Sequence, residues 1–365
     1  MDVVSLLQVL GGLVLLVAGG EVLVRGASAL AVDIGISPLV VGLTVVSVAT
    51  SAPELAVTTG AVFSGESDLA LGNVVGSNIA NILLILGISA LVLPLDVRRQ
   101  LVRVDVPFLI AFGVVLLLLS SDGDIGTFDG GLLLAVWVGH SVLSVWLSKR
   151  GDIPAEAVET DAPRVSVPAA LALVAVGVGL LVGGSNLLVS GAVAIAAALG
   201  LSSLVIGLTV VAIGTSLPEL VASLMAVRKG ATDLAVGNAV GSCLANIGLV
   251  LGVPALINPG GLPVPGAALA VDLPLMVATS LALLPVVYTG GRIARREGAL
   301  FVGLYVAYTT YLVLDASGRE SEGGFSLVMV ALVLPLVGVT LLVLAGRERA
   351  HRVRRRASAE GHRGA

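Results

Sequence analysis

The chain contains one sequence pattern twice. Residues 42–91 align without a gap on residues 207–256 at a constant shift of 165, and roughly 29 of the 50 aligned positions are identical. Beyond these segments, the residues around Asp105 match those around Asp272. Self-similarity over such a length indicates a duplicated structural unit. We therefore expect the two halves of the chain to share one internal fold.

Long apolar stretches show what kind of unit is duplicated. Only 12% of the residues are charged and 57% are hydrophobic, whereas about a quarter of a soluble protein is charged. The charges lie in short runs between the apolar stretches, which is typical of membrane spans joined by short loops. Hydropathy predicts an all-α polytopic membrane protein with eleven spans, near residues 3–33, 38–64, 68–93, 104–120, 129–148, 167–199, 203–228, 233–257, 267–289, 298–315 and 325–345.

The repeat unit covers five of these spans, and five is an odd number. The second copy must then enter the membrane from the side opposite to the first, so the halves are expected to be inverted-topology repeats whose site lies near the midplane between them. The predicted domains are a first repeat at 1–150 (spans 1–5, with the motif 42–91), a linker at 151–166, a second repeat at 167–316 (spans 6–10, with the motif 207–256), an extra span at 325–345 and a basic tail at 346–365.

The distribution of lysine and arginine predicts the orientation. With eleven spans, the basic loops, such as Arg98-Arg99 and Arg292 to Arg296, all fall on one face, and the acidic loops, such as Asp122-Asp124, fall on the other. Basic loops remain in the cytoplasm. We expect a protein of the cell membrane with its N-terminus outside and its linker and C-terminus in the cytoplasm.

Each repeat places one glutamate inside an apolar span, Glu54 in the first and Glu219 in the second. A charge at the bilayer centre costs at least about 2.5 kcal/mol, so intramembrane acids usually have a function. The repeat symmetry brings these two acids together, where they would repel one another unless cations were bound between them. The alternative to ion binding is a structural role, in which each glutamate is protonated and only holds helices together.

A proline precedes each glutamate and breaks the helix there. Proline has no N–H, so Pro53 and Pro218 deprive the carbonyls four residues earlier, at Ala49 and Gly214, of their helical partners. Such carbonyls must face protein, water or ions. The same turns carry four hydroxyls, those of Thr50, Ser51, Thr215 and Ser216. Carboxylate, carbonyl and hydroxyl oxygens suit calcium or sodium rather than zinc or copper. Hydrogen bonding of these hydroxyls back to their own helix is the alternative.

The next span of each repeat offers further oxygen atoms. Ser77 and Asn81 are four residues apart and share a helix face, as do Ser242 and Asn246. Nearby glycines allow a close approach of this helix to its neighbour. These side chains are predicted to reach the space between the glutamates, with simple bonding between helices as the alternative.

The motifs ATSAPE and GTSLPE, each followed by GNVVGSN or GNAVGSC, resemble the two alpha-repeats of the calcium/cation antiporter superfamily, most closely its prokaryotic sodium/calcium exchanger branch. The resemblance implies that Glu54 and Glu219 bind calcium together with Thr50 and Thr215. It further implies sodium sites at Ser51, Ser77, Ser216 and Ser242, central positions at Asn81 and Asn246, and carbonyl ligands at Ser47 and Ala212. The sequence departs from the pattern at Cys243, where asparagine is expected.

These features together predict a secondary antiporter that exchanges Ca²⁺ for Na⁺ by alternating access. We expect no enzymatic activity, no cofactor and no nucleic-acid partner. The expected partners are the two ions and membrane lipid. The sequence leaves the oligomeric state open, and a monomer is one of the options. A proton-coupled calcium exchanger is the nearest alternative, and a cation channel is the next. An intramembrane protease is disfavoured because His140 is the only histidine in a span.

Three polar groups outside the motifs are expected to have structural roles. Glu21 and Arg25, four residues apart, are predicted to form a local ion pair. Asp105, near the end of a span, is expected to touch headgroups or a loop. His140 is expected to be a hydrogen-bonded polar residue rather than a proton relay.

Overall fold

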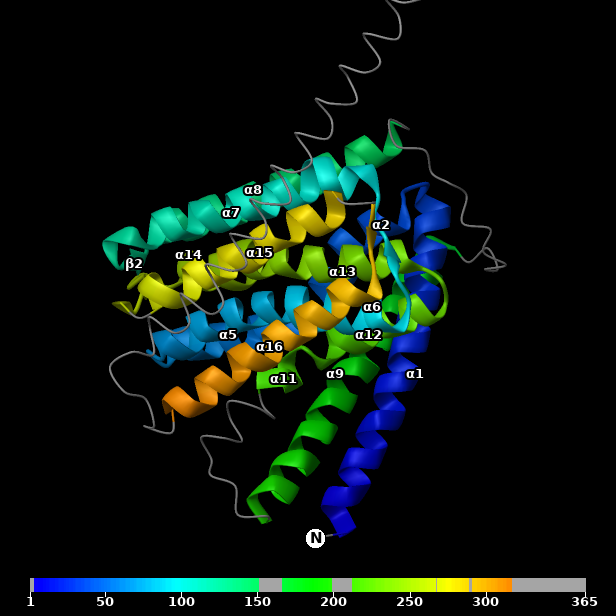
Figure 1. Ribbon diagram of the computed structural model, residues 1–365, viewed down its shortest axis with the longest axis horizontal. Helices are drawn as coiled ribbons and strands as arrows, with labels where there is room; N and C mark the ends of the chain where they lie inside the picture. The colour runs from blue at the N-terminus through cyan, green and yellow to red at the C-terminus, as the bar shows by residue number, and fades with distance from the viewer. Residues whose placement is uncertain (1–2, 151–165, 199–211, 267, 289–290, 317–365) are drawn as a thin grey trace, which may run out of the picture.

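The computed structural model describes residues 3–150, 166–198, 212–266, 268–288 and 291–316. These residues form helices joined by short turns, with two pairs of very short antiparallel strands (Figure 1). The predicted linker, the extra span at 325–345 and the basic tail lie outside the described residues, apart from Ser166 at the end of the linker.

The elements of the first half follow the order predicted from hydropathy. They are α1 (Val3–Ile34), α2 (Pro38–Val41), the π-helix η1 (Gly42–Val46), α3 (Ser47–Thr50), α4 (Ala52–Phe63), α5 (Ser67–Ile79), the π-helix η2 (Ala80–Ile85), α6 (Leu86–Val92), β1 (Leu95–Asp96), the π-helix η3 (Leu101–Asp105), α7 (Val106–Leu119), the 3₁₀ turn η4 (Ser120–Asp122), β2 (Asp124–Ile125) and α8 (Thr127–Lys149).

The second half repeats this order. It contains α9 (Val167–Ala198), α11 (Ala212–Thr215), α12 (Leu217–Arg228), α13 (Thr232–Ala245), the π-helix η6 (Asn246–Leu251), α14 (Gly252–Ile257), β3 (Leu262–Pro263), the π-helix η7 (Ala268–Asp272), α15 (Leu273–Tyr288), β4 (Arg292–Ile293) and α16 (Arg295–Ala316).

Seven helices of the described residues are long and apolar enough to cross a membrane, or eight if a bent pair is counted as one span. The bent pair comprises residues 38–50 and 52–63, which meet at 47°. The structure therefore confirms a polytopic helical membrane protein, but it does not confirm the predicted number of eleven spans. The span expected at 203–228 is described only from Ala212 onward.

The two strand pairs mark opposite ends of the molecule. At one end β1 pairs with β4, and at the other β2 pairs with β3. In Figure 1, α5 runs from the β2–β3 end toward the β1–β4 end, whereas α13, its counterpart in the second half, runs the other way. Each strand pair joins the two halves of the chain. We call these ends the β1–β4 end and the β2–β3 end.

Glycines allow a close contact between the two halves where α1 packs against α9. A Cβ atom built on Gly12 would lie 2.7 Å from the carbonyl oxygen of Gly184, and one on Gly184 would lie 2.9 Å from the carbonyl oxygen of Gly12. Only glycine permits this approach of two backbones. The two helices project together from the bundle in Figure 1.

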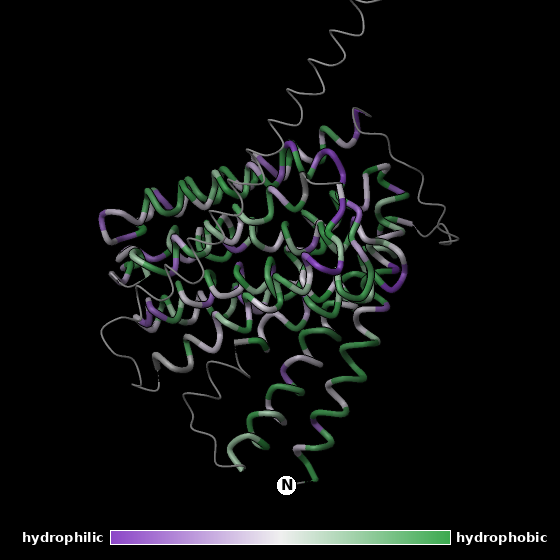
Figure 2. The backbone as a smooth tube through the Cα atoms, viewed as in Figure 1, coloured by the Kyte–Doolittle hydropathy of each residue, from purple (hydrophilic) through white to green (hydrophobic). Residues whose placement is uncertain are grey.

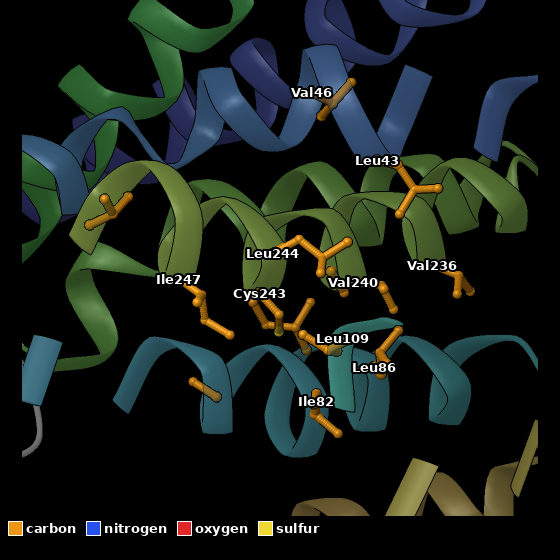
Figure 3. Close-up of a cluster of buried hydrophobic side chains, with 14 of the residues drawn as sticks. Leu43, Val46, Ile82, Leu86, Leu109, Val236, Val240, Cys243, Leu244 and Ile247 are labelled. Carbon is orange, nitrogen blue, oxygen red and sulfur yellow. The ribbon is translucent and has the colours of Figure 1, made fainter. Parts of the chain in front are cut away.

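Helix α13 lies at the centre of the bundle. All its residues from Leu234 to Ala245 are buried. In the hydrophobic cluster of Figure 3, the side chains of α13 lie between Leu43 and Val46 on one side and Ile82 and Leu86 on the other. A helix that is buried all round belongs to the core rather than to the surface.

The outer helices present apolar side chains outward. Val3, Leu7 and Val14 of α1 and Phe128 and Val142 of α8 are all more than half exposed. Figure 2 shows hydrophobic residues along these helices and hydrophilic ones in the turns at their ends. Such a surface is suited to lipid, because apolar patches of this extent are rare on soluble monomers.

Candidate ion-binding site between the two halves

The predicted break before each glutamate is present in both halves. The helix stops at Ser51 and at Ser216, whose backbone angles are nearly the same (φ −80°, ψ 9° and φ −89°, ψ 5°). Each new helix then has proline as its second residue and its glutamate in the first turn. Proline fits this position because its missing N–H would be unpaired there in any case. The two glutamates therefore occupy equivalent positions.

The structure brings the two glutamates together in the interior. Glu54 and Glu219 are each 1% exposed, and their carboxyl groups are close enough to interact electrostatically. The hydroxyl of Ser51, on the turn before Glu54, donates a hydrogen bond to Oε1 of Glu219 at 3.4 Å. A residue of the first half thus contributes to the surroundings of the second half's acid.

The hydroxyls of the broken turns are also in place. Thr50 and Ser51 are buried, and Thr50 donates to the Ser47 carbonyl and to Oδ1 of Asn238, both at 3.3 Å. Ser216 is buried, whereas Thr215 is half-buried. The hydrogen bond of Thr50 to its own helix is the structural alternative to ion binding. The second hydrogen bond of Thr50 reaches Asn238 in the other half.

The predicted carbonyl groups differ in their surroundings. The Ser47 carbonyl accepts bonds from Thr50 and from the backbone N–H of Ser51. The Gly214 carbonyl accepts a bond from Ser185 of α9 at 2.6 Å, so a hydroxyl meets the carbonyl that proline leaves free. The other two residues, Ala49 and Ala212, lie in α3 and at the first position of α11.

Two asparagines that were not predicted as site residues hold the glutamate turns. Asn73 donates to the backbone carbonyl of Glu54 at 3.2 Å and to Thr58 at 2.9 Å. In the second half, Asn238 donates to the carbonyl of Glu219 at 3.2 Å and to Ser223 at 3.0 Å. The repetition of Gly-Asn in both motifs was the available signal. The sequence did not show what these asparagines bind, because the groups that accept their hydrogen bonds lie 15 and 19 residues away in the chain.

Helices α5 and α13, with the π-helices η2 and η6 that follow them, supply the remaining polar groups. Ser77, Asn81, Ser242 and Asn246 are all buried. Asn246 donates to Oδ1 of Asn78 at 3.1 Å, which joins the two halves. Asn81 and Asn246 lie in π-helices, and such local widening of a helix is frequent at functional sites.

Six oxygen atoms around this centre are buried and accept or donate no hydrogen bond. They are Oε2 of Glu54, Oε2 of Glu219, Oγ of Ser216, Oγ of Ser242, Oδ1 of Asn81 and Oδ1 of Asn246. An unpaired buried oxygen costs about 1–3 kcal/mol, and a carboxylate oxygen costs more. All six are hard oxygen ligands, as sodium and calcium require.

One further buried acid lies outside this centre. Asp105 is wholly buried, accepts from His140 at 3.1 Å and from Ser144 at 3.4 Å, and His140 stacks on Phe108. The expectation that Asp105 touches headgroups or a loop is wrong, because α8 covers it. The expectation that His140 is hydrogen-bonded is confirmed.

A polytopic helical membrane protein with paired buried acids and unpaired buried oxygens between duplicated halves has the features expected of a cation transporter. The model of the sodium/calcium exchanger protein family matches residues 4–146 and again residues 169–314. The chain therefore belongs to the sodium/calcium exchanger family, a family of transporters rather than enzymes.

Similar proteins have names that agree with this assignment. The chain is 40% identical to the putative antiporter CaxA of Alkalimonas amylolytica over 86% of its length and 99% of the relative's. It is 31% identical to the sodium/calcium exchanger MaX1 of Methanosarcina acetivorans, with the same coverage of both chains. Among solved structures, the sodium-calcium exchanger NCX_Mj is 31% identical, with a TM-score of 0.73 over 85% of this chain and 99% of that one. The chain is thus a multi-pass membrane protein of a cation antiporter family.

Proposed function

We propose that this protein exchanges Ca²⁺ for Na⁺ by alternating access around one site shared by the two halves. The observation that carries the proposal is the pair of buried glutamates, on equivalent turns, surrounded by oxygens without hydrogen-bond partners. The proposed ligands are Glu54 and Glu219 with the hydroxyl, amide and carbonyl groups described above. No bound cofactor is required.

Charge explains why the two ions would exclude each other. Two ionised carboxylates carry a charge of −2, which one calcium ion or two sodium ions neutralise. Because both ions need the same hard oxygens, either loading is possible but not both. Mutual exclusion at one site is the requirement for exchange. The names of the relatives, one a sodium/calcium exchanger and another a putative antiporter, support this reading.

The proposed architecture is two inverted repeats of five spans, at 1–150 and 167–316, with an extra span at 325–345. It is supported by the double match to the family model and by the opposed directions of α5 and α13 (Figure 1). The turns that carry Arg98, Lys229 and Arg292 lie at the β1–β4 end. We assign this end to the cytoplasm, with the linker and C-terminus there and the N-terminus outside.

Proton-coupled calcium exchange is the second candidate. Two interacting acids in a buried site favour it, because either acid could take up a proton in place of a sodium ion. In that case, calcium movement would follow a pH gradient without sodium.

The test uses the purified protein in vesicles loaded with radioactive calcium. External sodium, at equal pH on both sides, is expected to release the calcium. A proton gradient without sodium is expected not to. Release by the proton gradient alone would replace the sodium-coupled reading with the proton-coupled one, and a large uncoupled current would indicate a channel.

A further inference from the structure

Asn78 of α5 lies between two groups of the second half of the chain. Its amide Nδ2 donates a hydrogen bond to Sδ of Met276 in α15 at 3.3 Å. Its Oδ1 accepts a hydrogen bond from Nδ2 of Asn246 at 3.1 Å. All three side chains are 1% exposed. They form a buried series of hydrogen bonds, which we call the asparagine network.

The sulfur atom determines how both amides of the asparagine network are oriented. A thioether sulfur can only accept a hydrogen bond, so Met276 requires the NH₂ group of Asn78 on its side. Oδ1 of Asn78 then faces Asn246, and it requires the NH₂ group of Asn246 in turn. This leaves Oδ1 of Asn246 on the other side of its amide, where it is buried without a hydrogen-bond partner. The network thus holds Asn246 with an oxygen, rather than an NH₂ group, free for a cation.

The first half of the chain has no equivalent network for Asn81. In the repeat, Asn246 aligns with Asn81, Asn78 with Cys243 and Met276 with Leu109. A leucine side chain forms no hydrogen bond, and the thiol of Cys243 donates instead to the backbone carbonyl of Asn78 at 3.6 Å. Cys243 and Leu109 both lie in the hydrophobic cluster of Figure 3. Oδ1 of Asn81 is also buried and unpaired, but the aligned residues do not hold its amide in one orientation.

We propose that Asn78 and Met276 are positioning residues that fix Asn246 as an oxygen ligand of the transported cation, and that Cys243 leaves Asn81 without this support. The inference rests on the proposed ion site and deepens it. A ligand that is already held in its bound orientation loses little conformational freedom when the ion binds, so it contributes more to affinity. The two halves of the site are therefore unequal, although both motifs carry the central asparagine.

Two substitutions remove the support but leave Asn246 in place. Asn78→Cys gives the first half the residue that the second half already carries, and calcium binding is expected to weaken about tenfold, as for other groups that orient metal ligands. Met276→Leu nearly conserves the volume of the side chain but removes the sulfur that orients Asn78. We expect a loss of about threefold, since a single hydrogen bond is lost. Isothermal titration calorimetry of the purified full-length protein measures the dissociation constants.

Leu109→Met is the matched control for Met276→Leu. It is the reverse exchange at the equivalent position, and the new sulfur has no amide to orient because residue 243 is cysteine. We expect the calcium affinity of the wild type. If Asn78→Cys and Met276→Leu both bind calcium as tightly as Leu109→Met, the asparagine network does not position a ligand and the proposal is overturned.

A double-mutant cycle separates positioning from a general role in packing. If Asn78 acts through Asn246, Asn78→Cys should change calcium affinity by less than about twofold once Asn246→Ala is present. In the Asn81→Ala background, the loss of about tenfold should persist. A tenfold loss in both backgrounds would show that Asn78 does not act through Asn246, and the proposal would be wrong.

These binding measurements do not depend on the coupling ion. A proton-coupled exchanger would also bind calcium, so the cycle tests the asparagine network whichever ion drives transport. Failure of sodium to release calcium from vesicles would reject the proposed function and leave the result of the cycle intact. Independent effects of Asn78→Cys and Asn246→Ala would reject the network even in a protein that exchanges calcium for sodium.

Discussion

At the scale of single residues, the site depends on two acids that the fold buries completely. Glu54 and Glu219 each have one carboxylate oxygen without a partner, while the asparagines Asn73 and Asn238 fix the backbone that carries them. The division of roles is simple. The carboxylates supply charge for the ion, and the amides hold the turns from which those carboxylates project.

Neutralising one acid should remove ion binding without unfolding the protein. Glu54→Gln or Glu219→Gln keeps the shape of the side chain but removes one of two charges, so calcium affinity is expected to fall at least about 100-fold. Isothermal titration calorimetry of the purified protein measures this calcium affinity. Glu66→Gln, at an exposed loop position, is the control. Normal calcium binding by either site variant would mean that the acids are not the ligands.

Removing an amide should act through the acid that it positions. Asn238→Ala deprives the Glu219 carbonyl and Ser223 of their donor, and we expect calcium affinity to fall about tenfold, as for other residues that orient ligands. The control is Asn186→Ala on the exposed face of α9. If the variant lowers the melting temperature but leaves calcium affinity unchanged, Asn238 has only a structural role.

At the scale of helices, proline and glycine determine the geometry that the site requires. Proline ends the hydrogen-bond ladder before each glutamate, and glycine lets α1 and α9 approach to backbone contact. The π-helices that contain Asn81 and Asn246 also interrupt the regular α-helical hydrogen-bond pattern next to the site. Regular helices throughout would offer no free backbone carbonyls to an ion.

Restoring the missing N–H should impair transport more than stability. Pro53→Ala allows the helix to continue through Ser51, because residue 53 can then donate to the Ala49 carbonyl. We expect the rate of sodium-dependent calcium release to fall about tenfold or more, as expected when ligands move by an ångström. Pro38→Ala, at the start of α2, is the control. An unchanged rate in Pro53→Ala would remove the broken turn from the mechanism.

A methyl group at the contact of α1 and α9 should destabilise the protein. In Gly184→Ala, the new Cβ would lie 2.8 Å from the Leu16 backbone nitrogen, and overpacking of this kind costs about 1–3 kcal/mol. Gly183→Ala, on the same helix but with nothing within 4 Å, should be neutral or stabilising. Thermal unfolding in detergent compares the two. Equal melting temperatures would show that α1 and α9 are not packed at Gly184.

At the scale of the whole molecule, the site exists only where the two halves meet. Ser51 of one half contacts Glu219 of the other, Thr50 contacts Asn238, and Asn246 contacts Asn78. The two strand pairs and the Arg98–Asp233 ion pair also connect one half to the other. Neither half contains a complete set of these interactions.

Separated halves should therefore bind calcium only in combination. Chains of residues 1–150 and 167–316 expressed alone are expected to show no saturable calcium binding, whereas their co-expression should restore it. Copurification of the two fragments in a fixed ratio checks that they associate. Binding with full affinity by one fragment alone would contradict a site shared between the halves.

Much of this protein was predictable from local sequence. Hydropathy placed most of the helices within a few residues, because burial in lipid requires apolar stretches of a set length. The duplicated motifs indicated the acids, the broken turns and the oxygen-rich character of the site, because proline and intramembrane acids have strong local consequences. The resemblance of those motifs indicated the family that the comparisons confirm.

Only the tertiary structure decided which groups meet. The asparagine bonds to the glutamate turns, the burial of Asp105 under His140 and the pairing of Lys229 with Glu21 join residues far apart in the chain. Such contacts depend on how the two halves pack against each other, which no local propensity specifies.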